Sequence, residues 1–242
     1  MSRSTPLLSC HRAAGARLVD FHGWLLPLHY GSQLEEHRRV RAAAGLFDVS
    51  HMTVLDLEGA GEGSRAEPFL RRLLALDVGP LAPGQARYGC MLNEAGGVVD
   101  DLIAYRLGPD RFRLVLNAAT RDRDLAWMAA QGLGAVAWRE REDLAMLALQ
   151  GPRARGLLHG LLGEAARARA EGLAPFHALE LEEAGGPVGG PLFLARTGYT
   201  GEEGYELLVP GERAAGIGCV GVIPETPGRC RGRPCSPVSR SM

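Results

Sequence analysis

Three strand patterns that follow one another across short turns constrain the fold of this chain most strongly. They read ARYGCMLN from residue 86, VVDDLIAYRL from residue 98 and FRLVLNA from residue 112. The connecting segments, NEAGG and GPDR, are too short to hold a crossover helix, so neighbouring strands must run antiparallel. We therefore expect an antiparallel sheet over residues 86–118.

Helix patterns lie on both sides of this region. The first begins with a capping box from Ser32 to Glu35 and ends before Gly45. Further helices are expected over residues 65–76, 119–131 and 152–162, and further strands over 46–59, 143–150, 176–183, 191–197 and 205–210. Strands and helices do not alternate strictly, which favours an α+β fold made of antiparallel sheets with flanking helices.

Charge and hydropathy exclude several classes of protein. With 27 basic and 28 acidic residues among 242, the net charge of -1 gives no field that would attract nucleic acid or an anionic membrane. No run reaches the roughly eighteen apolar residues of a membrane span, and the N-terminus lacks the apolar core of a signal peptide. Five cysteines without a CxxC pair favour a reducing compartment, so we expect a cytoplasmic protein.

The sequence carries no motif for metal, phosphate or triad chemistry. The seven histidines form no HExxH or zinc-type cluster, so no metal site is predicted. His51 has no carboxylate partner fixed by spacing, and no serine lies in a GxSxG elbow, which argues against a hydrolase triad. The glycine-rich run at 59–63 lacks the lysine of a phosphate loop.

The run RTGYTGEEGYEL, residues 196–207, lies between two apolar strand patterns. Its glycines at 198, 201 and 204 are expected to adopt positive φ and to let the backbone approach a ligand closely. Two tyrosines and Glu206 add flat faces and a carboxylate, which is how a slot for a planar heterocycle with paired hydrogen-bond donors could be built. The alternative is an ordinary glycine-rich hairpin turn.

Two adjacent carboxylates, Asp100 and Asp101, form the second candidate site. Because side chains alternate along a strand, Asp101 shares a face with Ile103 and Tyr105, whereas Asp100 faces the other way. Bulkier apolar neighbours predict that Asp101 is the more desolvated of the two, which requires a cation or a donor nearby. Asp100 is expected to bond the preceding hairpin loop. The alternative is that both residues only terminate an edge strand.

Five runs together resemble the aminomethyltransferase family, the T-proteins of the glycine cleavage system. In chain order they are VDFHGWLLPLHYGSQLEEHRRVRAAAGLFDVSHM, MLNEAGGVVDDLIAY, LVLNAATRDRDLAWM, LALQGP and RTGYTGEEGYEL. The resemblance covers about residues 5–210. It implies a folate-binding aminomethyltransferase fold with interleaved sub-domains, one made of residues 1–47 with 140–210 and the other of residues 48–139.

The resemblance also implies a reaction. The aminomethyl group carried on the lipoyl arm of H-protein would pass to tetrahydrofolate, releasing ammonia and forming methylenetetrahydrofolate. Asp101 would be the catalytic carboxylate beside the reactive folate nitrogens, and Glu206 would bind the pterin through its paired donors. The ring would be lined or anchored by Met52, Tyr88, Asn117 and Tyr199.

The resemblance ends near Ala215. Residues 211–242 do not match the family and show no sustained apolar period, so they are expected to form a disordered tail with no packed element. Family members continue into a C-terminal β-barrel domain, so this sequence is interpreted as C-terminally truncated. Two hypotheses follow: an aminomethyltransferase, or an inactive product or non-catalytic folate-binding module.

Overall fold

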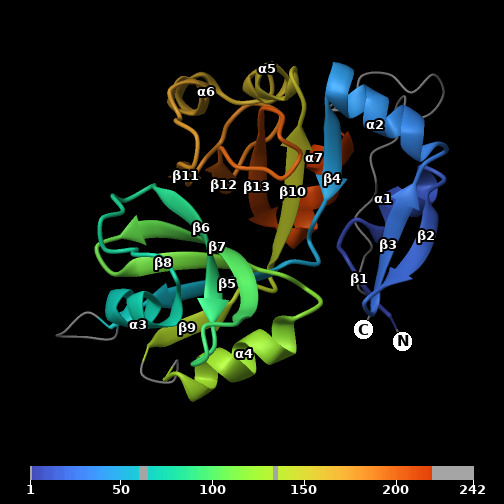
Figure 1. Cartoon of the computed structure of the whole chain (residues 1–242). Coiled ribbons are helices and arrows are strands. Elements are labelled where there is room, and N and C mark those ends of the chain that lie inside the picture. The colour runs from blue at the N-terminus through green and yellow to red at the C-terminus, as the bar shows by residue number, and fades with distance from the viewer. Residues whose placement is uncertain (1, 60–64, 133–135, 220–242) are drawn as a thin grey trace, which may run out of the picture.

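A computed structural model describes residues 2–59, 65–132 and 136–219, in which helices pack beside three sheets (Figure 1). The expected α+β architecture with antiparallel sheets is confirmed. The sequence predictions for residues 220–242 and for most of the run 59–63 lie outside the described residues.

The N-terminal part forms a small sheet with two helices beside it. Its strands, in the order β1-β3-β2, are β1 (Arg3–Ser4), β2 (Arg17–Phe21) and β3 (Trp24–His29). The helices are α1 (Leu8–Ala13) and α2 (Gln33–Ala42). The predicted start of α2 is confirmed, because the Ser32 hydroxyl accepts a hydrogen bond from the Glu35 amide at 3.4 Å.

The second sheet joins a strand from early in the chain to four later ones. In the order β11-β12-β13-β10-β4, its strands are β4 (Gly45–Asp48), β10 (Leu144–Gln150), β11 (Ala178–Leu181), β12 (Leu192–Ala195) and β13 (Gly204–Pro210). Helices α5 (Ala154–His159) and α6 (Glu164–Glu171) cover its outer face (Figure 1). Leu158 and Ala170 of these helices pack in one apolar cluster with Leu149 and Tyr205 of the sheet.

The third sheet contains the predicted antiparallel meander. In the order β6-β7-β8-β5-β9, its strands are β5 (Thr53–Glu58), β6 (Ala86–Leu92), β7 (Val98–Gly108), β8 (Arg111–Leu116) and β9 (Ala137–Glu140). Helices α3 (Ala66–Leu73) and α4 (Arg121–Ala130) pack on one face, where Phe69 and Met128 join Leu102 and Leu114 in a second cluster. Since β7 lies between β6 and β8, the edge-strand alternative for Asp100 and Asp101 is wrong.

A third cluster joins the inward faces of the two five-stranded sheets. Tyr105 and Val115 come from the third sheet, whereas Met146, Phe193 and Leu208 come from the second. The rings of Tyr105 and Phe193 meet edge to face with centroids 5.2 Å apart. The face of β7 that carries Asp101 is therefore the face turned towards the other sheet.

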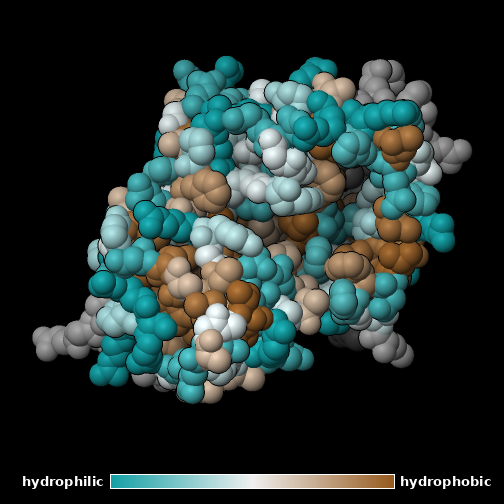
Figure 2. All heavy atoms as spheres, in the orientation of Figure 1, coloured by the Kyte–Doolittle hydropathy of each residue, from teal (hydrophilic) through white to brown (hydrophobic). Residues whose placement is uncertain are grey.

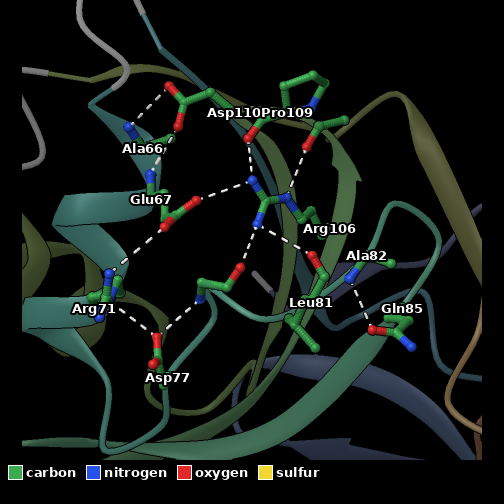
Figure 3. A network of polar contacts seen from close by, with 12 residues as sticks. Ala66, Glu67, Arg71, Asp77, Leu81, Ala82, Gln85, Arg106, Pro109 and Asp110 are labelled. Atoms are coloured by element: carbon green, nitrogen blue, oxygen red, sulfur yellow. Dashed lines mark hydrogen bonds and ion pairs between the residues drawn. The ribbon is translucent and has the colours of Figure 1, made fainter.

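A polar network centred on Arg106 holds the far end of β7 (Figure 3). The Arg106 guanidinium donates to the Gly79 carbonyl at 2.9 Å and to Glu67 at 3.0 Å, and Asp110 accepts from the backbone amide of Glu67 at 2.9 Å. Asp110 thereby satisfies free amides at the start of α3. The network ties α3 and the loop that precedes β6 to the β7–β8 turn, so β7 is fixed at the end opposite Asp101.

The chain remains packed just beyond Pro210, contrary to the expectation of no ordered element there. A 3₁₀ turn, η2 (Gly211–Arg213), leads into α7 (Ala214–Cys219). Ala214 and Ile217 are buried in the cluster under α5 and α6. Two apolar residues three positions apart gave too short a pattern to reveal this turn of helix from sequence.

Candidate active site

Glu206 lies in a row of small residues on the inward face of the second sheet. On β10 it pairs with Ala148, which pairs in turn with Phe47 of β4, and on β12 it pairs with Ala195. Because alanine methyl groups flank the carboxylate on both neighbouring strands, no bulky side chain of those strands covers it. Phe47 stands at one end of the row, two strands away.

Two hydroxyl groups hold one oxygen of this carboxylate. Thr197 and Tyr105 both donate to Glu206 Oε2, Tyr105 at 3.3 Å. Among the described residues, Oε1 accepts no hydrogen bond and no ion pair involves Glu206. Burial raises the pKa of Glu206, while the two hydroxyls oppose that effect by stabilising the charged form. The site presents a half-buried acceptor with one oxygen left for a ligand.

Tyr199 stands beside this acceptor. Its ring meets Phe47 edge to face at 5.5 Å between centroids, and 58% of the residue is exposed. Partial burial of the hydroxyl and the nearby Glu206 carboxylate raise the pKa of Tyr199. An exposed aromatic ring next to a carboxylate is suited to contact a flat polar ligand.

The glycines of this loop serve different purposes from those predicted. Of the three, only Gly201 has a positive φ, +76°. A Cβ at Gly198 would lie 2.1 Å from Gln150 Oε1, and one at Gly204 would lie 2.4 Å from Gln150 Nε2. Gly198 is thus required by the buried Gln150 side chain, and Gly204 by that side chain together with the Leu149 carbonyl oxygen at 2.3 Å, and neither is required by positive φ. The loop is indeed the β12–β13 connection, as the hairpin alternative proposed.

Three of the predicted site residues meet at Asp101. The Tyr88 hydroxyl donates to Asp101 Oδ2 at 2.8 Å, and Asn117 Nδ2 lies 3.4 Å from Oδ1 and 3.2 Å from the Asp101 carbonyl oxygen. Tyr88 is 62% exposed, so this end of the cluster opens to solvent. The hydrogen bond to Asp101 raises the pKa of Tyr88.

The prediction that Asp101 is the more desolvated carboxylate is wrong. Asp100 is 8% exposed, whereas Asp101 is only half-buried. Asp100 also bonds Asn117 and Thr120, from the segment after β8, and not the preceding hairpin loop. The reason is that α4 packs over the Asp100 face, which the apolar pattern of β7 alone does not reveal.

The two candidate carboxylates face the same space between the sheets. Asp101 and Tyr105 share one face of β7, and the Tyr105 hydroxyl reaches Glu206. Four residues of strand separate the Cα atoms of Asp101 and Tyr105 by about 13 Å. Asp101 and Glu206 therefore border one inter-sheet face from opposite sheets.

Met52 belongs to the same inter-sheet core. It packs against the inter-sheet cluster and lines a pocket of about 410 Å³ together with Trp24, His51 and Arg141. Neither Asp101 nor Glu206 lines that pocket. Figure 2 shows hydrophobic atoms in a hollow between the second sheet and the β2–β3 hairpin.

Sequence reasoning missed the hydroxyl partners of Glu206. Thr197 is close to it in sequence, but Tyr105 is 101 residues away, and only the packing of one sheet on the other brings them together. Among the described residues, no group of three or more His, Cys, Asp or Glu side chains could hold a metal ion, and no helix has the length and hydrophobicity needed to cross a bilayer.

Comparisons with known proteins find longer relatives, which this chain matches over part of their length. The GCVT N-terminal domain matches residues 7–217. An aminomethyltransferase from Stenotrophomonas maltophilia (strain K279a) is 53% identical over 212 residues, covering 87% of this chain and 55% of the relative. One from Xylella fastidiosa (strain M23) is 53% identical over 214 residues, covering 88% and 56%. The chain thus spans about half the length of the curated relatives that it matches.

Solved structures show the same arrangement. The glycine cleavage system aminomethyltransferase T from Bartonella henselae aligns with a TM-score of 0.77 and 36% identity, covering 90% of this chain and 56% of that one. Heterotetrameric sarcosine oxidase from Corynebacterium sp. U-96 aligns with a TM-score of 0.52 and 20% identity, covering 86% and 87%. The second likeness concerns the fold alone.

Proposed function

The chain belongs to the GCVT N-terminal domain family, and from this premise we propose that it binds tetrahydrofolate between Glu206 and Asp101 and supports aminomethyl transfer. The observation that carries the proposal is Glu206 itself. Its carboxylate is half-buried, flanked by alanines and free of a cation among the described residues. A pterin ring N–H and its exocyclic amine are paired donors that one carboxylate accepts together.

Asp101 is the proposed catalytic carboxylate. When ammonia leaves the transferred carbon, positive charge develops there, and a preorganised carboxylate stabilises such charge better than water does. The Tyr88 hydroxyl and the Asn117 amide orient Asp101 before substrate arrives. Tyr199 and Met52 are proposed to contact the folate ring.

The proposed reaction needs a donor protein. Lipoylated H-protein would carry the aminomethyl group, and tetrahydrofolate would accept it to give methylenetetrahydrofolate with release of ammonia. The names of the relatives support this assignment. We place the reaction in the cytoplasm.

The proposed sub-domains follow the two large sheets. Residues 1–47 with 140–210 would form one unit and residues 48–139 the other. The second sheet contains β4 and β10–β13, whereas the third sheet contains β5–β9. This distribution of strands supports the division. The substrate would then lie where the two units meet.

Calorimetric titration with tetrahydrofolate tests the proposal. Glu206→Gln should weaken binding by about 1–3 kcal/mol, because the amide nitrogen cannot accept the second pterin N–H. Glu182→Gln is the matched control, since Glu182 is an exposed glutamate beyond β11 in the same sheet. Equal affinity in both variants would exclude the pterin contact. Binding without ammonia release on addition of aminomethylated H-protein would favour the non-catalytic folate-binding alternative.

A further inference from the structure

A second buried carboxyl group, Asp124, lies behind the Asp101 cluster. It lies in the first turn of α4 and is 0% exposed. Among the described residues, neither of its oxygens accepts a hydrogen bond from an N–H or O–H group. The guanidinium of Arg123 lies 3.7 Å away, but that side chain is 58% exposed and donates to the Val99 carbonyl. An ionised carboxylate in this position would be poorly compensated.

The group that Asp124 does contact is another carboxyl. Asp100, on β7, is 8% exposed and lies within hydrogen-bonding reach of Asp124. Asp100 already accepts from the Thr120 hydroxyl at 2.6 Å and from Asn117 Nδ2 at 3.2 Å. The hydroxyl of Thr120 also lies near Asp124, but its single hydrogen has two other acceptors, Asp100 Oδ2 at 2.6 Å and the Asn117 carbonyl oxygen at 3.2 Å. Within the part of the chain that the structure describes, the hydrogen best placed to join the two carboxyl groups is one bound to them.

We propose that Asp124 holds a proton that it donates to Asp100, and that this acid–carboxylate pair positions Asp101 through Asn117. The Asn117 amide group is shared between Asp100 Oδ1 and Asp101 Oδ1, at 3.2 and 3.4 Å. The Asp100 carboxylate is held by three donors, from Asp124, Thr120 and Asn117. It thereby fixes the orientation of the Asn117 amide, which in turn orients Asp101. Asp100 and Asp124 are therefore positioning residues, and their effect on turnover rests on the function proposed above.

The electrostatics agree with this geometry. Burial, followed by the Asp100 carboxylate, raises the pKa of Asp124 to about 7. Burial alone would raise the pKa of Asp100 too, but the hydrogen bonds from Asp124, Thr120 and Asn117 lower it. Asp100 from β7 and Arg123 from the same helix are the charged groups that face Asp124. Two touching carboxyl groups cannot both ionise cheaply, so the pair keeps one proton.

The variant Asp124→Asn distinguishes a carboxyl pair that holds a proton from an ordinary structural contact. Asparagine resembles the neutral acid and can donate to Asp100, so the variant should fold. The pKa of Asp124 is raised by folding, so its contribution to stability is present at low pH and is lost as the pH rises towards about 7. We compare the two proteins by the ratio of their folding equilibrium constants, unchanged protein over variant. This ratio should fall about tenfold per pH unit between pH 5 and 7, and then level off.

Denaturant unfolding of the full chain measures this ratio at each pH. Asp122→Asn is the control, because Asp122 lies on the same helix with its side chain 92% exposed. Parallel pH profiles for Asp124→Asn and the unchanged protein would overturn the proposal. Loss of a protonated-carboxyl infrared band at pH 6 in Asp124→Asn, and not in Asp122→Asn, would support it.

Turnover provides a separate readout. Asn117→Ala should preserve the pH dependence of stability, since the pair remains, but lower kcat at least tenfold, because Asp101 loses its link. Unchanged kcat in Asn117→Ala would refute the positioning role. If the unchanged chain binds no tetrahydrofolate, the proposed function fails, while the stability profile still decides whether the pair holds a proton.

Discussion

Replacing Tyr105 by phenylalanine removes one oxygen atom from the junction between the two sheets. Tyr105 is 0% exposed, and its ring would keep its edge-to-face contact with Phe193. The lost hydroxyl lies 3.3 Å from Glu206 Oε2 and 3.0 Å from Thr197 Oγ1. Thr197 uses its own hydrogen on Glu206, so the Tyr105 hydrogen is shared between these two acceptors.

The magnitude follows from that geometry. A hydrogen bond to a charged group contributes about 1.5–3 kcal/mol. The long distance to Glu206 places the loss near the lower end, so we expect Tyr105→Phe to reduce the free energy of unfolding by about 1.5 kcal/mol at pH 7.

The pH dependence gives a second check. Burial raises the pKa of Glu206, so its contribution to stability is complete at low pH and is lost as the pH rises through the folded-state value. Removing a donor to the carboxylate raises that pKa further. The deficit of Tyr105→Phe should therefore be largest above the folded-state pKa and shrink as the pH falls below it, because the folded carboxyl is then protonated and loses the charge that the donor stabilises.

Urea unfolding at pH 4 and pH 7 measures both quantities. Tyr88→Phe is the matched control, because it deletes the same atom from a hydrogen bond to an aspartate on a residue that is 62% exposed. Its cost should be below about 0.5 kcal/mol, as for most surface substitutions. An equal cost for both variants would show that the buried junction between the sheets does not depend on this hydroxyl.

Two further predictions concern the proposed catalytic group and the Gln150 contact. Asp101→Asn should leave the circular dichroism spectrum unchanged and lower turnover by about a hundredfold or more, as expected for removal of one electrostatic group, and unchanged kcat would remove Asp101 from the mechanism. Gly198→Ala should destabilise the chain by about 1–3 kcal/mol through overlap with Gln150. Gly156→Ala in α5, where a Cβ meets nothing within 4 Å, should instead stabilise it by about 0.5–1 kcal/mol, and thermal melts that fail to show opposite signs would contradict the packing argument.

Local patterns in the sequence were sufficient to predict those helices and strands whose formation depends on neighbouring residues in the chain. The meander of β6, β7 and β8 follows from short turns between apolar runs, and the start of α2 follows from Ser32. The alternation along β7 was also predicted: Leu102 packs on the helix side, whereas Ile103 packs towards the other sheet. Each of these features depends on contacts within a few residues.

The environment of each carboxylate depended on contacts across the molecule. Asp100 is buried because α4 covers its face, and Glu206 is held by Tyr105 because two sheets share a core. Gly198 and Gly204 are needed because Gln150, about fifty residues earlier, fills the space beside them, together with the Leu149 carbonyl beside Gly204. The sequence by itself determined which residue types occur and which strand face each one occupies, since a strand alternates every two residues. Only the tertiary structure decided which carboxyl is desolvated and which donor reaches it, because burial and hydrogen bonding are set by the packing of segments far apart in the chain.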